Sequence, residues 1–185
     1  MSADMRGEYE VFSTLRTCIL EGLSLFGISK DVDVRRFAQA NFNHGDKLVL
    51  LNLVNTRRVG WQSRSYESTL HENVDEFSRT DAWIEEQVYQ ISCIKRMLKT
   101  DTETTITAED IATSLITWFN GRGLDWLREH SLSCYPIDPN SIIVYNDDSD
   151  LYQRRPVFNV TVIVNKKFKA AYPEVDVIGV ETRPI

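Results

Sequence analysis

Hydrophobic and polar residues alternate most regularly between Leu151 and Lys167, which is the longest alternating run in the chain. Successive side chains of an extended backbone point to opposite faces, so this alternation predicts a strand with one buried face. The β-branched residues favour the same structure, and Pro156 fits the start or the edge of a strand. The residues expected on the buried face are Phe158, Val160, Val162 and Val164. We expect this antiparallel strand to organise the fold.

Two segments carry the three- and four-residue spacing of apolar positions that is typical of amphipathic helices. The first runs from Glu8 to Phe26, and Gly27 is expected to end it. The second runs from Thr107 to Asn120, where a hydroxyl residue at the start and Asp110 three positions later form a weak version of a capping box. Its main apolar positions are Ile111, Leu115, Trp118 and Phe119. A shorter helical turn is expected within residues 124–132.

The remaining pattern predicts further strands and one long extension. Residues 47–54 are almost continuously apolar, which is typical of a strand buried on both faces. Residues 83–98 and 141–145 also have strand character. Residues 29–46 mix charged and turn-forming residues, and residues 44–46 are expected to form a turn before the next strand. Residues 63–83, whose second half is polar and aperiodic, are expected to form an extended loop or hairpin.

The order of these elements predicts an α+β fold in which an antiparallel β-sheet packs against two main α-helices. A long β-hairpin or loop extension would project from this sheet. The sequence shows neither an internal repeat nor a linker, so a single domain over residues 1–185 is expected. Within that domain, residues 170–185 are expected to form a C-terminal arm.

The composition is that of a soluble globular protein, because 42% of the 185 residues are hydrophobic and 26% are charged. The net charge of −6 argues against general affinity for nucleic acids, since phosphate binding requires clustered Lys and Arg. The N-terminus lacks the pattern of a secretory signal, and no apolar run is long enough to span a membrane. The three cysteines, at irregular spacing, suit neither a disulfide framework nor a zinc site, so we expect a reducing compartment.

No arrangement of residues indicates catalysis, a cofactor or a metal. His130 and Cys134 are four residues apart, but two ligands do not make a structural zinc site. The acidic turn that contains Asp147, Asp148 and Asp150 lacks the ligand order of a calcium loop, so a solvated turn is favoured. We therefore expect a protein that has no catalytic residues, binds no cofactor or metal and is not an enzyme.

One surface cluster has the residue types of a protein interface. It comprises Arg57, Arg58, Trp61 and Arg64, and Arg and Trp are side chains that often anchor interfaces. We expect this cluster to contact a neighbouring subunit or another partner. The alternative is a solvated hairpin tip that happens to be basic, since single exposed apolar residues are common.

Taken in order, the predicted elements resemble those of the tail terminator, or neck, proteins of tailed bacteriophages. The segments that carry the resemblance are residues 8–26, 47–62, 85–96, 107–120 and 150–165, which together span most of the chain. The chain departs from the family pattern by the long insertion at 63–83 and by the stretch after Lys169. These departures leave open which neck component it is.

The resemblance implies a structural virion protein that acts by geometry rather than by chemistry. Its subunits would form a homohexameric ring that ends the growth of the tail tube and joins the tail to the head connector or stopper protein. The tail tube protein and, in a contractile tail, the tail sheath would be its further partners. Genomic DNA would pass through the lumen without specific binding, which the acidic balance suits. The protein would be assembled in the host cytoplasm and would then reside in the virion neck, without membrane contact.

Other function classes remain as alternatives. The chain would then be another neck or tail-completion adaptor, a host-side adaptor that binds through residues 55–64, or a small-ligand-binding or enzymatic α+β domain. The last of these requires a pocket with convergent polar groups. A size measurement separates them, because a ring supports the first class and a monomer with turnover of a substrate supports the last.

Overall fold

The structure, a computed structural model, describes residues 7–28, 32–37, 46–71, 74–96, 105–139, 142–145 and 155–172. Its elements follow one another as α1 (Glu8–Leu25), β1 (Val32–Arg36), β2 (Lys47–His71), β3 (Val74–Lys95), α2 (Ala108–Phe119), α3 (Arg122–Glu129), β4 (Leu132–Cys134), β5 (Ile143–Tyr145) and β6 (Arg155–Tyr172). The helices pack together on a sheet to which β-strands from the whole chain contribute. The α+β class expected from the sequence is therefore confirmed.

The described strands form one six-stranded sheet in the order β1-β2-β3-β6-β4, with β5 paired to β6 off this path. β1 runs parallel to β2, whereas the other pairs are antiparallel. The sheet is thus mixed rather than wholly antiparallel. β1 lies within residues 29–46, where the residue pattern predicts no strand. The hydrophobic pattern does not indicate β1, because this short strand places only Val32 and Val34 in the core and its other residues are charged.

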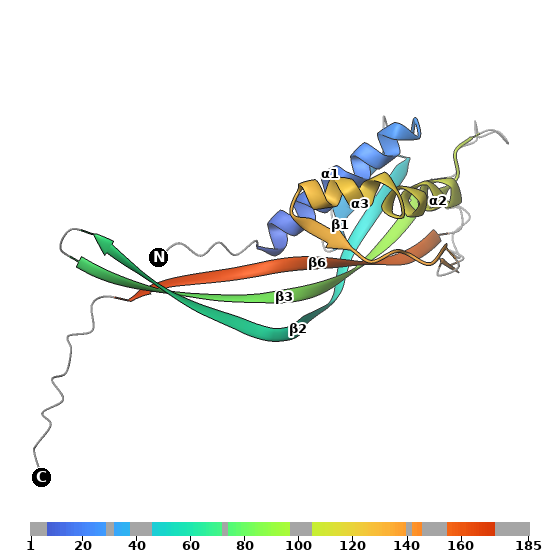
Figure 1. Ribbon diagram of the computed structural model, residues 1–185. Helices are drawn as coiled ribbons and strands as arrows, with labels where there is room; N and C mark the ends of the chain where they lie inside the picture. Colours follow the sequence, from blue (N-terminus) through green and yellow to red (C-terminus); the bar gives the residue numbers. More distant parts are fainter. Residues whose placement is uncertain are drawn as a thin grey trace, which may run out of the picture.

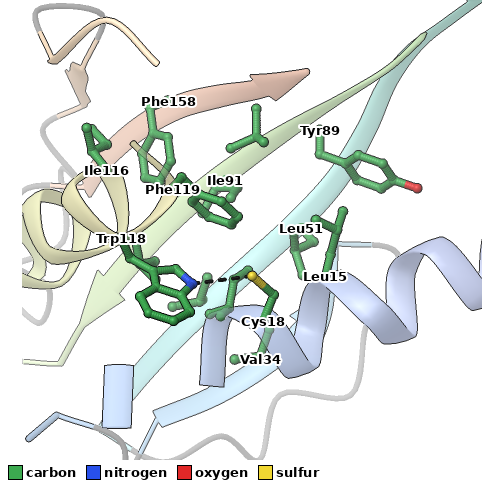
Figure 2. Packing of buried hydrophobic residues seen from close by; sticks show 14 of the residues in the cluster. Leu15, Cys18, Val34, Leu51, Tyr89, Ile91, Ile116, Trp118, Phe119 and Phe158 are labelled. Atoms are coloured by element: carbon green, nitrogen blue, oxygen red, sulfur yellow. Dashed lines mark hydrogen bonds between the residues drawn. The ribbon is translucent and has the colours of Figure 1, made fainter. Parts of the chain in front are cut away.

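α1, α2 and α3 lie on the same face of the sheet and cover only one end of it (Figure 1). Beneath them, the buried face of β6 is the one that the alternation predicts. Phe158, Val160, Val162 and Val164 are each no more than 2% exposed. They join residues of β2, β3 and all three of these helices in one hydrophobic cluster, part of which Figure 2 shows.

The helices begin and end close to where the spacing of apolar residues predicts. Thr107 caps α2 by accepting a hydrogen bond from the backbone N–H of Asp110, whose carboxylate in turn accepts from the backbone N–H of Thr107. α1 ends at a left-handed Gly27, with a φ of 71°. In the core between the helices, Trp118 Nε1 donates to Cys18 Sγ at 3.3 Å (Figure 2).

β2, β3 and β6 continue past the helices as a three-stranded extension of the sheet (Figure 1). β2 stays paired with β3 as far as His71 and Val74, and β6 follows β3 as far as Tyr172. Residues 63–71 and 74–83 are therefore strands of a hairpin and not a loop. We call residues 57–66, 79–86 and 165–168 of this extension the blade. Of the expected C-terminal arm, residues 170–172 complete β6 and residues 173–185 lie outside the described part.

Candidate protein-protein interface on the blade

Two irregularities in β2 decide which side chains share a face of the blade. The pairing of β2 with β3 shifts between Leu53 and Asn55 and again between Val59 and Ser63. The first shift adds one residue, so side chains that follow it swap faces relative to those before it. The second adds two residues, and it contains Gly60 in a left-handed conformation with a φ of 74°, which favours glycine.

As a result, the basic and aromatic cluster expected from the sequence is divided between two faces. Arg58 pairs with Glu85 and Arg64 with Asp81, which lie on the helix side of the sheet, whereas Arg57 pairs with Glu86 on the opposite side. We call this opposite side the outer face. Trp61 lies in the second irregularity and is 98% exposed. The four residues therefore do not form one contact surface.

On the outer face, Glu86 of β3 is hydrogen-bonded by one side chain from β2 and by one from the segment after β4. Arg57 Nε donates to one carboxylate oxygen at 2.6 Å, and the Tyr135 hydroxyl donates to the other at 2.6 Å. Glu86 is only 3% exposed, and the Tyr135 hydrogen bond, followed by that from Arg57, lowers its pKa. No residue pattern indicates this arrangement, because Tyr135 is 49 positions from Glu86.

On the helix side, Asp81 has the equivalent role. Arg79 Nε and Arg64 Nε each approach its carboxylate at 3.0 Å. Hydrogen bonding, first from Arg79 and then from Arg64, lowers the pKa of Asp81 to about 2. Nearby, the Arg58 guanidinium lies over the Trp83 ring, 4.7 Å from its centroid.

A hydrogen-bonded chain on the helix side connects the blade to the core. The Tyr89 hydroxyl donates to the side chain of Gln87 at 2.9 Å, and the Gln87 amide donates to Glu85 at 2.6 Å. The ammonium group of Lys166, on β6, lies 4.0 Å from Glu85. The two hydrogen bonds run along β3, and the Lys166 contact joins this strand to β6 at the base of the blade.

Charge is distributed unevenly across the strands of the blade. The carboxylates, Asp81, Glu85 and Glu86, all lie on the central strand, and their side chains are 5%, 18% and 4% exposed. The flanking strands carry only cations, of which Arg57 is 68% exposed and Arg64 is 49% exposed. With six cations and three carboxylates, the blade carries a net charge of +3 in a chain whose net charge is −6. The blade therefore presents positive charge to its surroundings.

The outer face also has an open groove of about 650 Å³. Its lining includes Val59, Ala82 and Ile84 from the sheet, with Trp61 and Lys167 beside them. Ile84 is 44% exposed, and Lys167 is exposed. A groove with an apolar floor, an exposed tryptophan and a lysine has the composition of a protein-binding surface rather than that of a catalytic cleft.

The other candidate residues show no shared site. His130 stacks on Trp126 with 3.7 Å between ring centroids, while Cys134 is 8% exposed in the core. Within the described ranges, no three His, Cys, Asp or Glu side chains are grouped as metal ligands would be. Asp147, Asp148 and Asp150 lie outside those ranges. None of the described helices is long and apolar enough to cross a membrane.

Comparison with known proteins gives one family. Residues 10–174 match the family described as E217 gateway protein gp29. This match includes α1 from Glu10 onward, the other two described helices, every described strand of the sheet and the whole blade. No curated protein matches the chain.

Proposed function

The chain belongs to the family of the E217 gateway protein gp29, a phage head-tail gateway protein, and we propose that it forms a closed ring at the head-proximal end of a phage tail tube. Family membership itself gives the coarser conclusion, a structural role at the head-tail junction of a virion. The ring, its position on the tube and its partners are the proposal. Tail tube protein would lie on one side of the ring and head connector or stopper protein on the other.

The shape of the subunit supports a ring. The helices cover one end of the sheet, and the blade projects from the other end (Figure 1). The two ends present different surfaces, so a contact between neighbouring subunits joins unlike patches. Such a heterologous contact produces a ring when its rotation closes, and a sixfold ring is the form that we propose.

The observation that carries the proposal is the blade itself, considered together with the family match. Among the described residues, β6 contributes none to the hydrophobic cluster of the body after Val164, where the three-stranded ribbon continues beyond the helices. Its buried carboxylates and exposed cations are instead suited to contact with another protein. We propose that the blade joins the ring to its neighbours, and that DNA passes through the lumen without specific binding.

The role can be tested by removing the gene from the phage that encodes it and supplying the protein from a plasmid. Without the protein, we expect filled heads that are separate from tails, and tails whose tube length is no longer uniform. Electron microscopy of the lysate measures both properties, and the plasmid should restore joined particles. Virions that assemble normally without the protein would contradict the proposal.

Tail length also separates the proposed function from its main alternative. An adaptor that joins heads to finished tails, but does not end tube growth, would leave separate tails of uniform length. A protein that ends tube growth would leave tubes of variable length. The same micrographs therefore decide between the two roles within the gateway family.

A further inference from the structure

The groove on the outer face of the blade combines apolar and polar lining residues with a potential aromatic anchor. Trp61 is 98% exposed beside it, and Ile84 on its floor is 44% exposed. A groove of about 650 Å³ is large enough to accept two large apolar side chains. Arg57 and Lys167 add positive charge to the same face. The fitting partner therefore offers apolar side chains next to negative charge.

The edges of the blade are poorly suited to binding by strand addition. Along β2, the edge strand, regular pairing is interrupted at Leu53/Asn55 and at Val59/Ser63. Along β6, the segment past β4 carries Lys166 and Lys167. Bulges and lysines are features that prevent a further strand from pairing with a sheet edge. We therefore expect a partner to bind the face of the blade rather than to add a strand at its edge.

The C-terminal end of α1 is the complementary surface on the same chain. Leu25 is 56% exposed and Phe26 is 42% exposed, and Glu21, one turn earlier, is exposed as well. The last turn of α1 has no basic residue, so the negative end of the helix dipole is not neutralised within the helix. This helix end combines exposed apolar side chains with negative charge.

The backbone holds this helix end in one conformation. Gly27 adopts the left-handed conformation, and the backbone N–H of Ile28 donates to the carbonyl of Leu23 at 2.8 Å. Ile28 itself is 6% exposed and is part of the core. The exposed pair is therefore presented by a rigid turn, which limits the entropy lost when it binds.

We propose that the C-terminal end of α1 of one copy docks into the blade groove of the next copy. Leu25 and Phe26 would lie against Trp61 and the groove floor, while Lys167 would face Glu21 and the helix carbonyls. In one subunit, α1 ends on the side of the body that lies away from the blade (Figure 1). Each copy can therefore offer its helix end to one neighbour and its groove to another. This inference rests on the proposed ring and specifies its subunit contact.

A charge exchange tests the electrostatic part of this contact. Lys167→Glu and Glu21→Lys should each weaken self-association of the full-length protein by about tenfold or more, because each places like charges together. A mixture of the two variants should recover association, since both contacts between unlike variants pair opposite charges again. Analytical ultracentrifugation over a concentration series measures the effect. Glu129→Lys, an exposed change in α3, is the control and should associate like the wild type.

An aromatic pair of variants tests the apolar part. Trp61→Ala should also reduce association by about tenfold or more, as expected for an interface anchor. Tyr66→Ala removes another exposed aromatic residue of the blade, 67% exposed, whose partner Arg79 lies on the helix side. It should leave association unchanged. Thermal melting followed by circular dichroism establishes that each variant is folded.

Cross-linking shows whether the two surfaces meet. Mixing Trp61→Cys with Phe26→Cys under mild oxidation should give a disulfide-linked dimer that neither variant gives alone. The native cysteines should not interfere, because burial raises the pKa of Cys18 to about 12 and that of Cys134 to about 11, and Cys93 is fully buried.

The outcomes separate this inference from the proposed function. Rings that persist in Trp61→Ala and in both charge variants, with no cross-linked dimer, would overturn the contact and leave the ring intact. A wild-type chain that stays monomeric at all concentrations, with no cross-linked dimer, would overturn the contact as well. The gene-deletion experiment tests separately whether virions need the protein.

Discussion

At the scale of single residues, the blade depends on carboxylates that are both buried and paired. Glu86 shares its two oxygens between Arg57 and Tyr135, so side chains from β2 and from the segment after β4 meet over β3. A buried carboxylate is tolerated only when its oxygens are satisfied. The arrangement therefore fixes the lateral positions of the strands where the sheet leaves the helices.

We predict that acid weakens the protein through these groups. The folded-state pKa of Glu86 is below its ordinary value of 4.5, and that of Asp81 is lowered from 3.8 to about 2. Because both values are depressed on folding, their contribution to stability is present above the ordinary values and is lost as the pH falls toward about 2. Urea unfolding at a series of pH values should show the midpoint falling within this window.

Variants identify the source of this acid dependence. Glu86→Gln should flatten the pH dependence, because the side chain no longer titrates. Tyr135→Phe should flatten it too, since the hydrogen bond that most lowers the pKa of Glu86 is removed. The double variant should add little to either change, because both act on one interaction. An acid dependence identical to that of the wild type in both single variants would contradict this account.

At the scale of elements, the helices are joined through one tryptophan that lies against two glycines. A Cβ atom built on Gly22 of α1 would lie 2.6 Å from the ring of Trp118, and one on Gly123 of α3 would lie 2.7 Å from the Trp118 carbonyl. The ring is further fixed by its hydrogen bond to Cys18 (Figure 2). The contact of α1 and α3 with α2 thus requires the absence of side chains at both positions.

We predict that Gly22→Ala destabilises the protein, although alanine favours helices more than glycine does. The added methyl must displace a buried indole, and such overpacking costs about 1–3 kcal/mol. Gly7→Ala is the matched control, because its Cβ would meet only a backbone nitrogen at 4.0 Å. Chemical denaturation of both variants measures the difference. A Gly22→Ala variant as stable as the wild type would show that the helices can separate without cost.

The elements also show what the sequence can and cannot predict. The helices and the buried face of β6 follow from periodicity, because burial of one face leaves a regular pattern. The hairpin strands from 63 to 83 leave no such pattern, since their stability depends on pairing within a three-stranded ribbon that lies beyond the helices. The division of Arg57 from Arg58 and Arg64 depends on the bulges in β2, whose positions no residue pattern reveals. The residue types in the sequence therefore indicate which residues belong to the candidate cluster, but they do not indicate on which face of the sheet each one lies.

At the scale of the whole molecule, charge and shape are arranged together. The blade has a net charge of +3, whereas α1, α2 and α3 together have seven carboxylates and three arginines, a net charge of −4. The positive charge is confined to the blade, since residues 67–78 contain four carboxylates and no Lys or Arg. Copies that place the helices of one subunit against the blade of the next bring opposite charges together, while copies placed blade to blade would repel each other. The distribution of charge thus favours the kind of contact that closes a ring.

We predict that the distal hairpin can be removed without loss of the fold. Arg64 and Asp81 are direct partners in the β2–β3 register, so residues 65–80 can be replaced by an Asn-Gly turn that closes the shorter hairpin. Among the described residues, the members of the hydrophobic cluster lie outside this segment, and the groove lining of Val59, Trp61 and Ile84 is retained. Arg79 is removed, but Arg64 still pairs with the buried Asp81. The shortened chain should therefore melt cooperatively near the wild-type temperature and should still self-associate.

The same variant should fail at a later step, because the distal hairpin is the part of the described chain that lies furthest from the helices (Figure 1). We expect it to contact the tail tube or the head connector, so the shortened protein should restore few joined particles in a phage that lacks the gene. Plaque counts and electron microscopy with the full-length protein as control measure this. Full restoration of joined particles by the shortened chain would show that the distal hairpin is not an assembly element. Loss of self-association in the shortened chain would instead place the subunit contact beyond residue 64 and exclude the groove as its centre.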